Sequence, residues 1–219
     1  MKNWILVLLV VATTLNFSAQ ISVADTTYRP KTYDQQVEQF RSYHNSENDI
    51  IFLGNSITAR NHWEELLQIP TARNRGISGD TTFGILERLD EITEGNPKKI
   101  FILIGINDIS RDFPDEIIIE NYKKILQRIK KESPSTRIYV QTILPVNANF
   151  GVYKNHYGKD DHILRINNFL KEMKKEKGLT IIDLHDHFLD TNNHLDAKYT
   201  EEGLHLNAEG YKLWAALLK

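Results

Sequence analysis

The sequence contains no cysteine among its 219 residues. A chain without cysteine cannot form disulfides or carry a lipid-modified amino-terminal cysteine, and it has no thiolate for catalysis or for metal binding. Its stability must therefore come from an ordinary hydrophobic core. About 195 residues remain beyond the amino-terminal segment, which is enough to build one such core.

The sequence also lacks an excess of charge of either sign. Its 27 Lys and Arg residues stand against 29 Asp and Glu residues, which gives a formal net charge of −2. Both signs are mixed along the chain, and no basic stripe is present that would bind the phosphates of a nucleic acid. We therefore expect no nucleic-acid partner.

No apolar run approaches the roughly 20 residues that a membrane-spanning helix needs. The run from Trp4 to Ala12 follows Lys2 and precedes small or polar residues, which is typical of a signal peptide. We expect residues 1–24 to be that peptide, cleaved between about positions 19 and 24, and residues 25–219 to form a single domain. The mature protein is then exported, to the periplasm or the extracellular space, without a stable membrane anchor. Its oligomeric state stays open.

Short apolar runs alternate with segments of helical periodicity. The runs that predict buried parallel strands are Ile50–Leu53, Ile100–Ile104, Arg137–Ile143 and Leu179–Leu184, with a shorter strand at Thr71–Asn74. The segments that predict helices are Asn61–Leu67, Thr82–Ile92, Asp115–Glu132, Asp161–Lys177 and Ala208–Leu218. Such alternation predicts an α/β fold, a three-layer α/β/α sandwich with a doubly wound, mainly five-stranded parallel sheet.

The longest segment without clear periodicity, Pro145–Lys159, follows the third long strand. Ligands of open α/β sheets bind beyond the carboxyl ends of the strands, so this segment is placed to form a substrate wall. Tyr153 and His156 within it are candidate substrate-binding residues, as is Asn55 after the first strand. An ordinary surface loop is the alternative.

Ser56 follows the first strand in a turn that begins with Gly54. A strand-to-helix turn exposes a hydroxyl above the sheet edge, and the backbone N–H groups that open the next helix can face an anion. Ser56 is therefore a candidate nucleophile. A residue that only caps the following helix would have the same local sequence.

Gly79 and Asn107 occupy comparable places after the second and third predicted strands in chain order. A glycine lets a backbone N–H approach a substrate oxygen closely, and an asparagine side chain can donate an amide N–H to the same space. With the Ser56 N–H, these donors predict an oxyanion hole. Each residue alone is also compatible with a turn or a cap.

His205 lies just before the last predicted helix, three residues after Glu202. A carboxylate at this spacing can fold back to accept a hydrogen bond from Nδ1–H, which leaves Nε2 free to take a proton from a serine. The pattern predicts His205 as general base and Glu202 as its partner. Because the base must be neutral, activity should fall as pH drops through about 6 to 7.

In order and placement after successive strands, these blocks resemble the SGNH hydrolases, also called the GDSL esterase family. Ser56, Gly79, Asn107 and His205 fall on the four family positions, and the resemblance spans about Ile50 to Tyr211. The blocks N-R-G-I-S-G-D-T-T and G-x-N-D are most similar to platelet-activating-factor acetylhydrolase-like enzymes and bacterial carbohydrate acetylesterases. The resemblance implies a flavodoxin-like SGNH fold.

Two positions depart from the family pattern. The family's G-D-S-L reads G-N-S-I, with Asn55 in place of the aspartate, so hydrogen bonding around the turn should differ. The usual D-x-x-H has Glu202 before His205, and the longer side chain must fold more tightly to reach Nδ1. Glu201, or a backbone carbonyl that leaves a Ser-His dyad, are the alternatives to Glu202.

The resemblance implies a serine esterase that needs no cofactor and removes short acyl groups, acetyl above all, from a carbohydrate or another small ester. The alternatives are a lysophospholipase or thioesterase for longer acyl chains and a non-catalytic carbohydrate-binding module, because fold alone does not fix function.

Motifs of three other enzyme classes are absent. The sequence has no G-x-S-x-G of an α/β-hydrolase, no P-loop and no dinucleotide fingerprint. A metal site at His185-Asp186-His187, with His194 nearby, is disfavoured because alternate side chains of a strand diverge. We therefore expect no metal.

Overall fold

The computed structural model describes residues 25–218. The predicted signal peptide, residues 1–24, lies outside the described residues. Among the described residues, no helix has both the length and the apolar character to cross a membrane.

The centre of the fold is a sheet of parallel strands in the order β2-β1-β3-β4-β5. The strands are β1 (Ile50–Gly54), β2 (Ala72–Gly76), β3 (Lys99–Leu103), β4 (Arg137–Gln141) and β5 (Leu179–Ile182). They lie within one or two residues of the predicted ranges. The predicted doubly wound parallel sheet is therefore confirmed.

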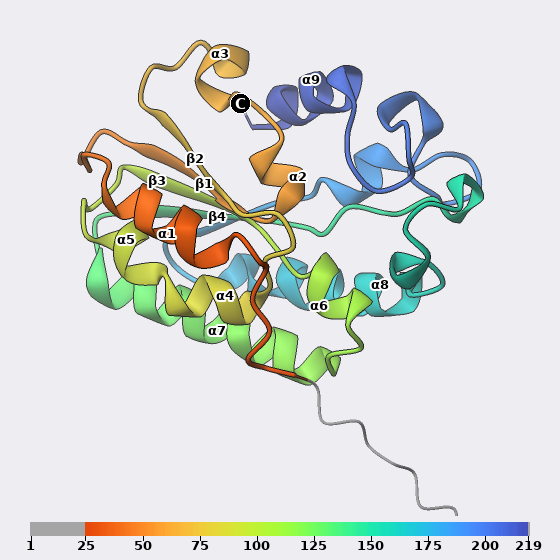
Figure 1. The fold of residues 1–219 in the computed structure, drawn as a ribbon, viewed down its shortest axis with the longest axis horizontal. Coiled ribbons are helices and arrows are strands. Elements are labelled where there is room, and N and C mark those ends of the chain that lie inside the picture. Colours follow the sequence, from red (N-terminus) through yellow and green to blue (C-terminus); the bar gives the residue numbers. More distant parts are fainter. Residues whose placement is uncertain (1–24, 219) are drawn as a thin grey trace, which may run out of the picture.

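Helices cover both faces of the sheet (Figure 1). One face carries α1 (Tyr33–Arg41), α4 (Thr82–Glu87), α5 (Leu89–Thr93), α7 (Asp115–Glu132) and α8 (Asp160–Glu172), and the other carries α3 (Trp63–Leu67) and α9 (Ala208–Leu217). Two short helices, α2 (Ser56–Ala59) and α6 (Ile106–Ser110), follow strands β1 and β3 directly.

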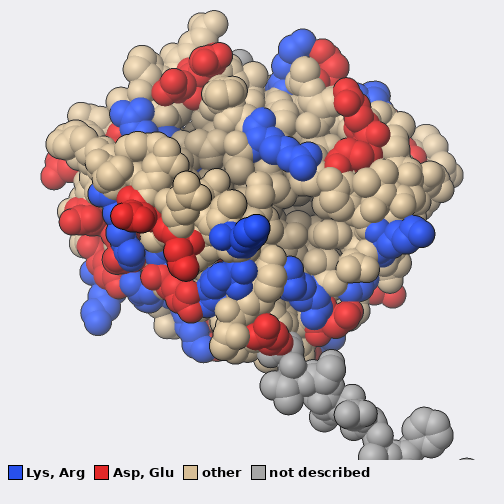
Figure 2. All heavy atoms as spheres, in the orientation of Figure 1, with Lys and Arg blue, Asp and Glu red and all other residues tan. Residues whose placement is uncertain are grey.

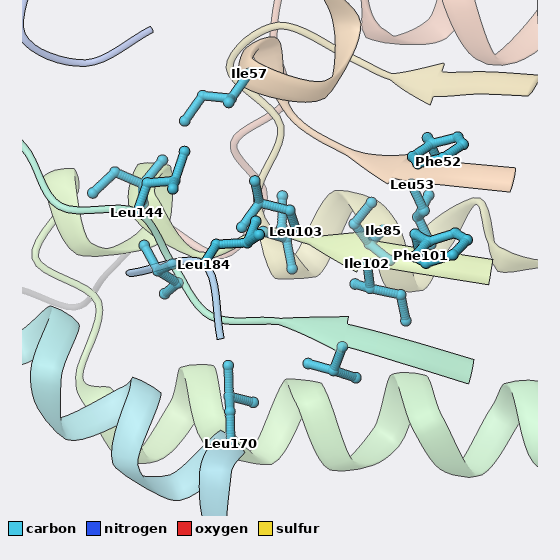
Figure 3. Close-up of a cluster of buried hydrophobic side chains, with 14 of the residues drawn as sticks. Phe52, Leu53, Ile57, Ile85, Phe101, Ile102, Leu103, Leu144, Leu170 and Leu184 are labelled. Carbon is cyan, nitrogen blue, oxygen red and sulfur yellow. The ribbon is translucent and has the colours of Figure 1, made fainter. Parts of the chain in front are cut away.

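The core lies between these layers, and Figure 3 shows strand side chains that point to both faces of the sheet. Leu53, Ile102 and Val140 are 0% exposed on successive strands, and buried side chains from the flanking helices pack against them. Burial on both faces explains why the strands are continuous apolar runs rather than alternating ones.

The helix predicted over Thr82–Ile92 is in fact two helices, which meet at Arg88 (φ −108°, ψ 14°). Arg88 is fully buried, and its guanidinium bonds to groups outside the helix. The apolar periodicity continues through the break, so the sequence pattern did not reveal it. The pattern also gave no prediction of α1, α2 or α6, because short or polar helices have little apolar periodicity.

The chain reverses its direction of winding at β1, since β2 lies on one side of this strand and β3 on the other. Ligand sites of open parallel sheets lie at such a reversal, beyond the carboxyl ends of the two strands. Ser56 follows β1 and Asn107 follows β3 after a few residues. The topology therefore brings these two predicted residues to one crevice.

Candidate active site

Ser56 is the first residue of α2, and the contacts of its neighbours fix this turn. The Ile57 N–H donates to Asn55 Oδ1 (3.0 Å), so Asn55 caps α2. The Asn74 amide donates to three carbonyls in and after α2, those of Thr58, Ala59 and Asn61. Ser56 is half-buried, so its hydroxyl lies at an accessible but well-defined place.

The structure brings the predicted base and carboxylate to this serine. His205 Nε2 lies 2.8 Å from Ser56 Oγ, and its Nδ1 lies 2.7 Å from Glu202 Oε1. The backbone N–H of His205 donates to the same Glu202 oxygen (2.5 Å). These are the contacts of a nucleophile, a base and a group that orients the base. Glu201, the alternative, is exposed.

A tight turn allows Glu202 to fold back far enough. Gly203 has φ +85°, and a Cβ at this residue would collide with the Asn147 carbonyl oxygen. The Thr200 hydroxyl accepts the Gly203 N–H (2.9 Å) and donates to the His205 carbonyl (2.7 Å). The longer carboxylate is therefore accommodated by a glycine turn and a threonine.

The charges around His205 favour its neutral form. Burial lowers the pKa of His205 and the Arg60 guanidinium lowers it further, while Glu202 opposes both, and the net pKa lies below its ordinary value. Burial also raises the pKa of Glu202, but hydrogen bonds from Tyr153 and His205 outweigh it and leave that pKa below normal. A neutral imidazole beside an ionised carboxylate is the state that a general base requires.

Asn107 has a defined amide orientation. Its Nδ2 donates to the Asp80 carbonyl (2.9 Å), and its Oδ1 lies 3.3 Å from His156 Nε2. One amide hydrogen is thereby used, and the second is left for an oxygen in the crevice. Neither the Ser56 nor the Gly79 backbone N–H has a hydrogen-bond partner within residues 25–218. The Ser56 and Gly79 N–H groups are therefore free to donate to a ligand, and so is one of the two Asn107 amide hydrogens.

His156, a predicted substrate-binding residue, has its polar contact with Asn107. Burial lowers the pKa of His156 to about 4, with help from the nearby His205 and Lys159. The neutral ring can satisfy Asn107 Oδ1 only with its Nε2 protonated. His156 thus helps to hold the Asn107 amide.

The other two predicted substrate-binding residues lie in different surroundings. The Tyr153 ring meets His205 edge to face, with centroids 5.2 Å apart, so this part of the 145–159 segment borders the site. Asn55 is 1% exposed and caps α2, and its Nδ2 has no partner among the described residues. A direct contact of any of the three with substrate stays a prediction.

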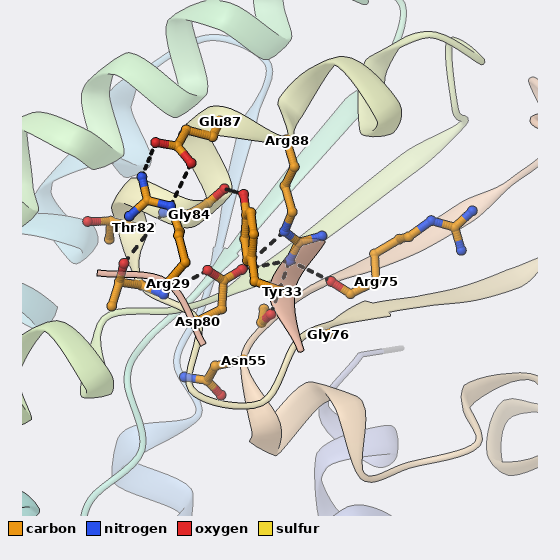
Figure 4. Close-up of polar contacts among 12 residues, drawn as sticks. Arg29, Tyr33, Asn55, Arg75, Gly76, Asp80, Thr82, Gly84, Glu87 and Arg88 are labelled. Atoms are coloured by element: carbon orange, nitrogen blue, oxygen red, sulfur yellow. Dashed lines mark hydrogen bonds and ion pairs between the residues drawn. The ribbon is translucent and has the colours of Figure 1, made fainter. Parts of the chain in front are cut away.

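A buried network of polar contacts includes Asp80, the residue after Gly79, together with Arg75 and Arg88 (Figure 4). The Arg88 guanidinium, 0% exposed, donates to the Asp80 carboxylate (Nε to Oδ2, 3.1 Å), to the Gly54 carbonyl (3.3 Å) and to the Arg75 carbonyl (2.8 Å). Gly54 precedes the nucleophile turn, and Asp80 follows Gly79. One side chain therefore joins the ends of β1 and β2 to the Gly79 loop.

Further contacts balance this network. Glu91 pairs with both Arg88 and Arg75 at 3.1 Å, so two cations face two carboxylates. A Cβ on Gly84 would collide with Asp80 Oδ1, so glycine is needed there. The sequence pattern did not reveal this network. Its available signal was an Arg and a Glu three residues apart, Arg88 and Glu91, within an apolar helical stretch.

Comparison with known proteins points to the same chemistry. Residues 52–213 match the GDSL-like Lipase/Acylhydrolase family. This range covers most of the chain and contains all four residues of the resemblance. The chain belongs to this family. It is therefore a GDSL-type acylhydrolase that acts on ester bonds.

Two relatives of this acylhydrolase carry names that refer to platelet-activating factor. It is 26% identical to the rat platelet-activating factor acetylhydrolase IB subunit alpha2 over 171 residues, which are 75% of this chain and 72% of that protein. A solved structure from Streptococcus pneumonia, provisionally described as a platelet activating factor, is 30% identical, with a TM-score of 0.76 over 86% of this chain and 91% of the other.

A third relative is much longer. The Escherichia coli N-acylneuraminate cytidylyltransferase is 28% identical over 202 residues, which are 84% of this chain but only 45% of that enzyme. The acylhydrolase thus spans less than half the length of this relative.

Proposed function

We propose that this acylhydrolase removes short acyl groups, above all acetyl, from a carbohydrate, with Ser56 as nucleophile and His205 as general base. The observation that carries the proposal is the chain of contacts from Ser56 Oγ through His205 to Glu202, at 2.8 and 2.7 Å. A merely helix-capping serine would not need a buried imidazole at hydrogen-bond distance.

In this mechanism Ser56 Oγ attacks the ester carbonyl while His205 Nε2 takes its proton. The tetrahedral oxyanion is stabilised by the Ser56 and Gly79 N–H groups and by the free Nδ2 hydrogen of Asn107. His205 then protonates the leaving alcohol, and water hydrolyses the acyl-enzyme by the same route. Glu202 stabilises the imidazolium that forms in each step.

Two observations support an acetyl group on a sugar. The mammalian relative is by name an acetylhydrolase, and the long bacterial relative is by name an enzyme of N-acylneuraminate, an acylated sugar acid. The side chains beside the serine and the base are polar or aromatic, among them Asn107, Tyr153 and His156. Such a lining suits a hydroxylated ring better than a long acyl chain.

The test is an acyl-length profile with p-nitrophenyl esters from acetate to dodecanoate, followed by acetylated sugars and lysophospholipid. We expect the highest kcat/KM for acetate and release of acetate from the sugars. The Ser56→Ala variant, which removes only the hydroxyl, should lose activity on every ester. Preference for octanoate or longer chains would favour the lysophospholipase or thioesterase alternative. If wild type and Ser56→Ala were equally inactive on all esters, the chain would be a non-catalytic binding module.

We also propose that the enzyme acts after export, because the sequence before residue 25 is typical of a signal peptide. Amino-terminal sequencing of the secreted or periplasmic protein tests this. A start between about residues 20 and 25 is expected, and intact protein confined to the cytoplasm would contradict it.

A further inference from the structure

Two arginines occupy equivalent places beside the candidate site. Arg60 is the C-cap residue of α2, four residues after Ser56, and Arg111 is the C-cap residue of α6, four residues after Asn107. Residues four apart lie on the same side of a helix. Each arginine is therefore one helical turn from a residue of the site, one after β1 and the other after β3.

Arg60 lies next to the base and its carboxylate. Its side chain is 49% exposed, and its Nη1 is 3.9 Å from Glu202 Oε2. The other Glu202 oxygen already accepts hydrogen bonds from the His205 backbone N–H and Nδ1. Arg60 thus has one distant carboxylate oxygen and the Tyr153 hydroxyl as partners and no close ion pair, so other guanidinium donors remain for a ligand.

Arg111 also lacks a close ion pair, but it is near enough to Asp25 to contribute, after the Thr27 hydrogen bonds, to the lowered pKa of that carboxyl. Arg111 is exposed, and its guanidinium carbon lies 3.1 Å from the centroid of the Tyr28 ring. No carboxylate lies within 4 Å of it in residues 25–218. Lys159 differs, because it is held by Asp112 (2.6 Å) and by the Ile109 carbonyl (2.8 Å). The two guanidinium groups are therefore the available cations here.

The positive charge of this region affects His156, which borders the site. Burial, His205, Lys159 and Arg111 lower the pKa of His156, and Glu202 is the neighbour that opposes them. Lys159 and Arg111 are the permanent cations of this set. Figure 2 shows blue side chains on the borders of the hollow near the centre of this face. The protein as a whole carries a net charge of −2, so the cations are local.

The leaving alcohol must lie beside His205, because Nε2 has to protonate its oxygen. The Tyr153 ring meets the imidazole edge to face, and Arg60 lies beside Glu202, the carboxylate that binds Nδ1 of the same imidazole. A guanidinium fork matches the geometry of a carboxylate or a phosphate. We propose that the alcohol moiety of the substrate is anionic, an acylated sugar that carries a carboxylate or a phosphate, bound by Arg60 and Arg111. This inference rests on the proposed esterase function.

The experiment compares three monoacetylated methyl glucosides that differ only at carbon 6, where they carry a hydroxymethyl group, a carboxylate or a phosphate. Acetate release is measured for each, with p-nitrophenyl acetate as a fourth substrate. We expect kcat/KM at least about fivefold higher for one or both anionic sugars than for the neutral one, which is the factor given by a charge pair near 4 Å in water. Salt should reduce this preference by screening.

Variants assign the preference to the two residues. Arg60→Gln and Arg111→Gln should each lower the ratio of anionic to neutral kcat/KM about fivefold. The ratio is measured at a pH well above the fall of each activity profile, because Arg60 also lowers the pKa of His205 and its loss affects both sugars alike at lower pH. Arg60→Lys keeps the charge and should keep most of the ratio. Arg41→Gln is the matched control, since Arg41 is half-exposed at the end of α1, paired with Asp90, and should not change the ratio.

The outcomes separate the two proposals. If the neutral sugar is hydrolysed as well as the anionic sugars or better, the proposal of an anionic alcohol moiety is wrong, while the proposed esterase function is unaffected. The same holds if only p-nitrophenyl acetate is cleaved, or if neither variant alters the preference. If Arg60→Gln lowers all four rates alike, Arg60 positions Glu202 instead of binding substrate. Inactivity on every ester contradicts the esterase function itself.

Discussion

The two halves of the site are held in different ways. The oxyanion half, with Gly79 and Asn107, rests on the buried Arg88 network. The base half, with Glu202 and His205, belongs to a loop held by uncharged hydrogen bonds, those of Thr200 within the Gly203 turn and that of the Asn147 N–H with the Gly203 carbonyl (2.8 Å). One half depends on charges without access to water, and the other depends on a backbone turn and its neutral hydrogen bonds.

This difference follows from what each half must do. Oxyanion donors act only if they are already aligned when charge develops, and a rigid buried network provides that alignment. The base must bind and release a proton in each step, so it needs a carboxylate partner that stabilises the protonated imidazole, and it does not need a rigid network of buried charges. We therefore expect damage to the two halves to have different kinetic signatures.

The largest effect should come from the oxyanion donor itself. Asn107→Ala removes the one side-chain donor and should lower kcat about 100- to 1000-fold with little change in KM. Steady-state kinetics on p-nitrophenyl acetate measure this. A fall in kcat of less than about threefold would exclude Asn107 from the oxyanion hole.

A smaller loss of kcat is expected when Arg88, in the buried network that supports the Gly79 loop, is replaced. Arg88→Met leaves the Asp80 carboxylate without its cation, and Glu91 keeps only Arg75. It should lower kcat about 10- to 100-fold, because the Gly54 and Gly79 segments lose their common partner. Thermal unfolding should show a loss of about 3 to 5 kcal/mol. Arg88→Lys, which keeps the charge, should recover part of kcat. Wild-type kcat in a folded but destabilised Arg88→Met protein would make the network purely structural.

In the base half, Glu202→Gln should lower kcat about 10- to 100-fold. The same Glu202 oxygen accepts both the His205 backbone N–H and Nδ1–H, so a glutamine keeps its oxygen there and preserves the tautomer. Only the negative charge is lost. Glu201→Gln is the matched control and should behave as wild type. If Glu201→Gln lowered kcat more than Glu202→Gln, Glu201 would be the partner of His205.

The smallest effect is a shift in the pH profile. The net pKa of His205 lies below its ordinary value, so kcat/KM should fall with decreasing pH at a lower pH than the ordinary histidine range, about 6.5. Arg60→Gln removes a nearby cation and should move that fall to higher pH. Activity that stays flat down to pH 4 would contradict His205 as the base.

The sequence predicted the sheet well because its strands are buried on both faces and form continuous apolar runs. It predicted the four family residues because each follows a strand or precedes a helix in a recognisable block. It could not predict how they are held. The break at Arg88 depends on carbonyls of β1 and β2, which are 34 and 13 residues away along the chain.

The same limit applies to His156 and to the two arginines. His156 was placed in a substrate wall by its position in a loop, whereas its contact with Asn107 spans 49 residues of sequence and requires the folded chain. Arg60 and Arg111 are unremarkable in the sequence. They become neighbours of one crevice only because β1 and β3 pair side by side.

The central claim is that Ser56 is the nucleophile, and the most direct measurement is mass spectrometry of the enzyme quenched with acid during turnover of an acetyl ester. The account predicts an acetyl group on the peptide that contains Ser56, with none in the Ser56→Ala protein. Acetylation of another residue during turnover, or full activity of Ser56→Ala, would contradict it.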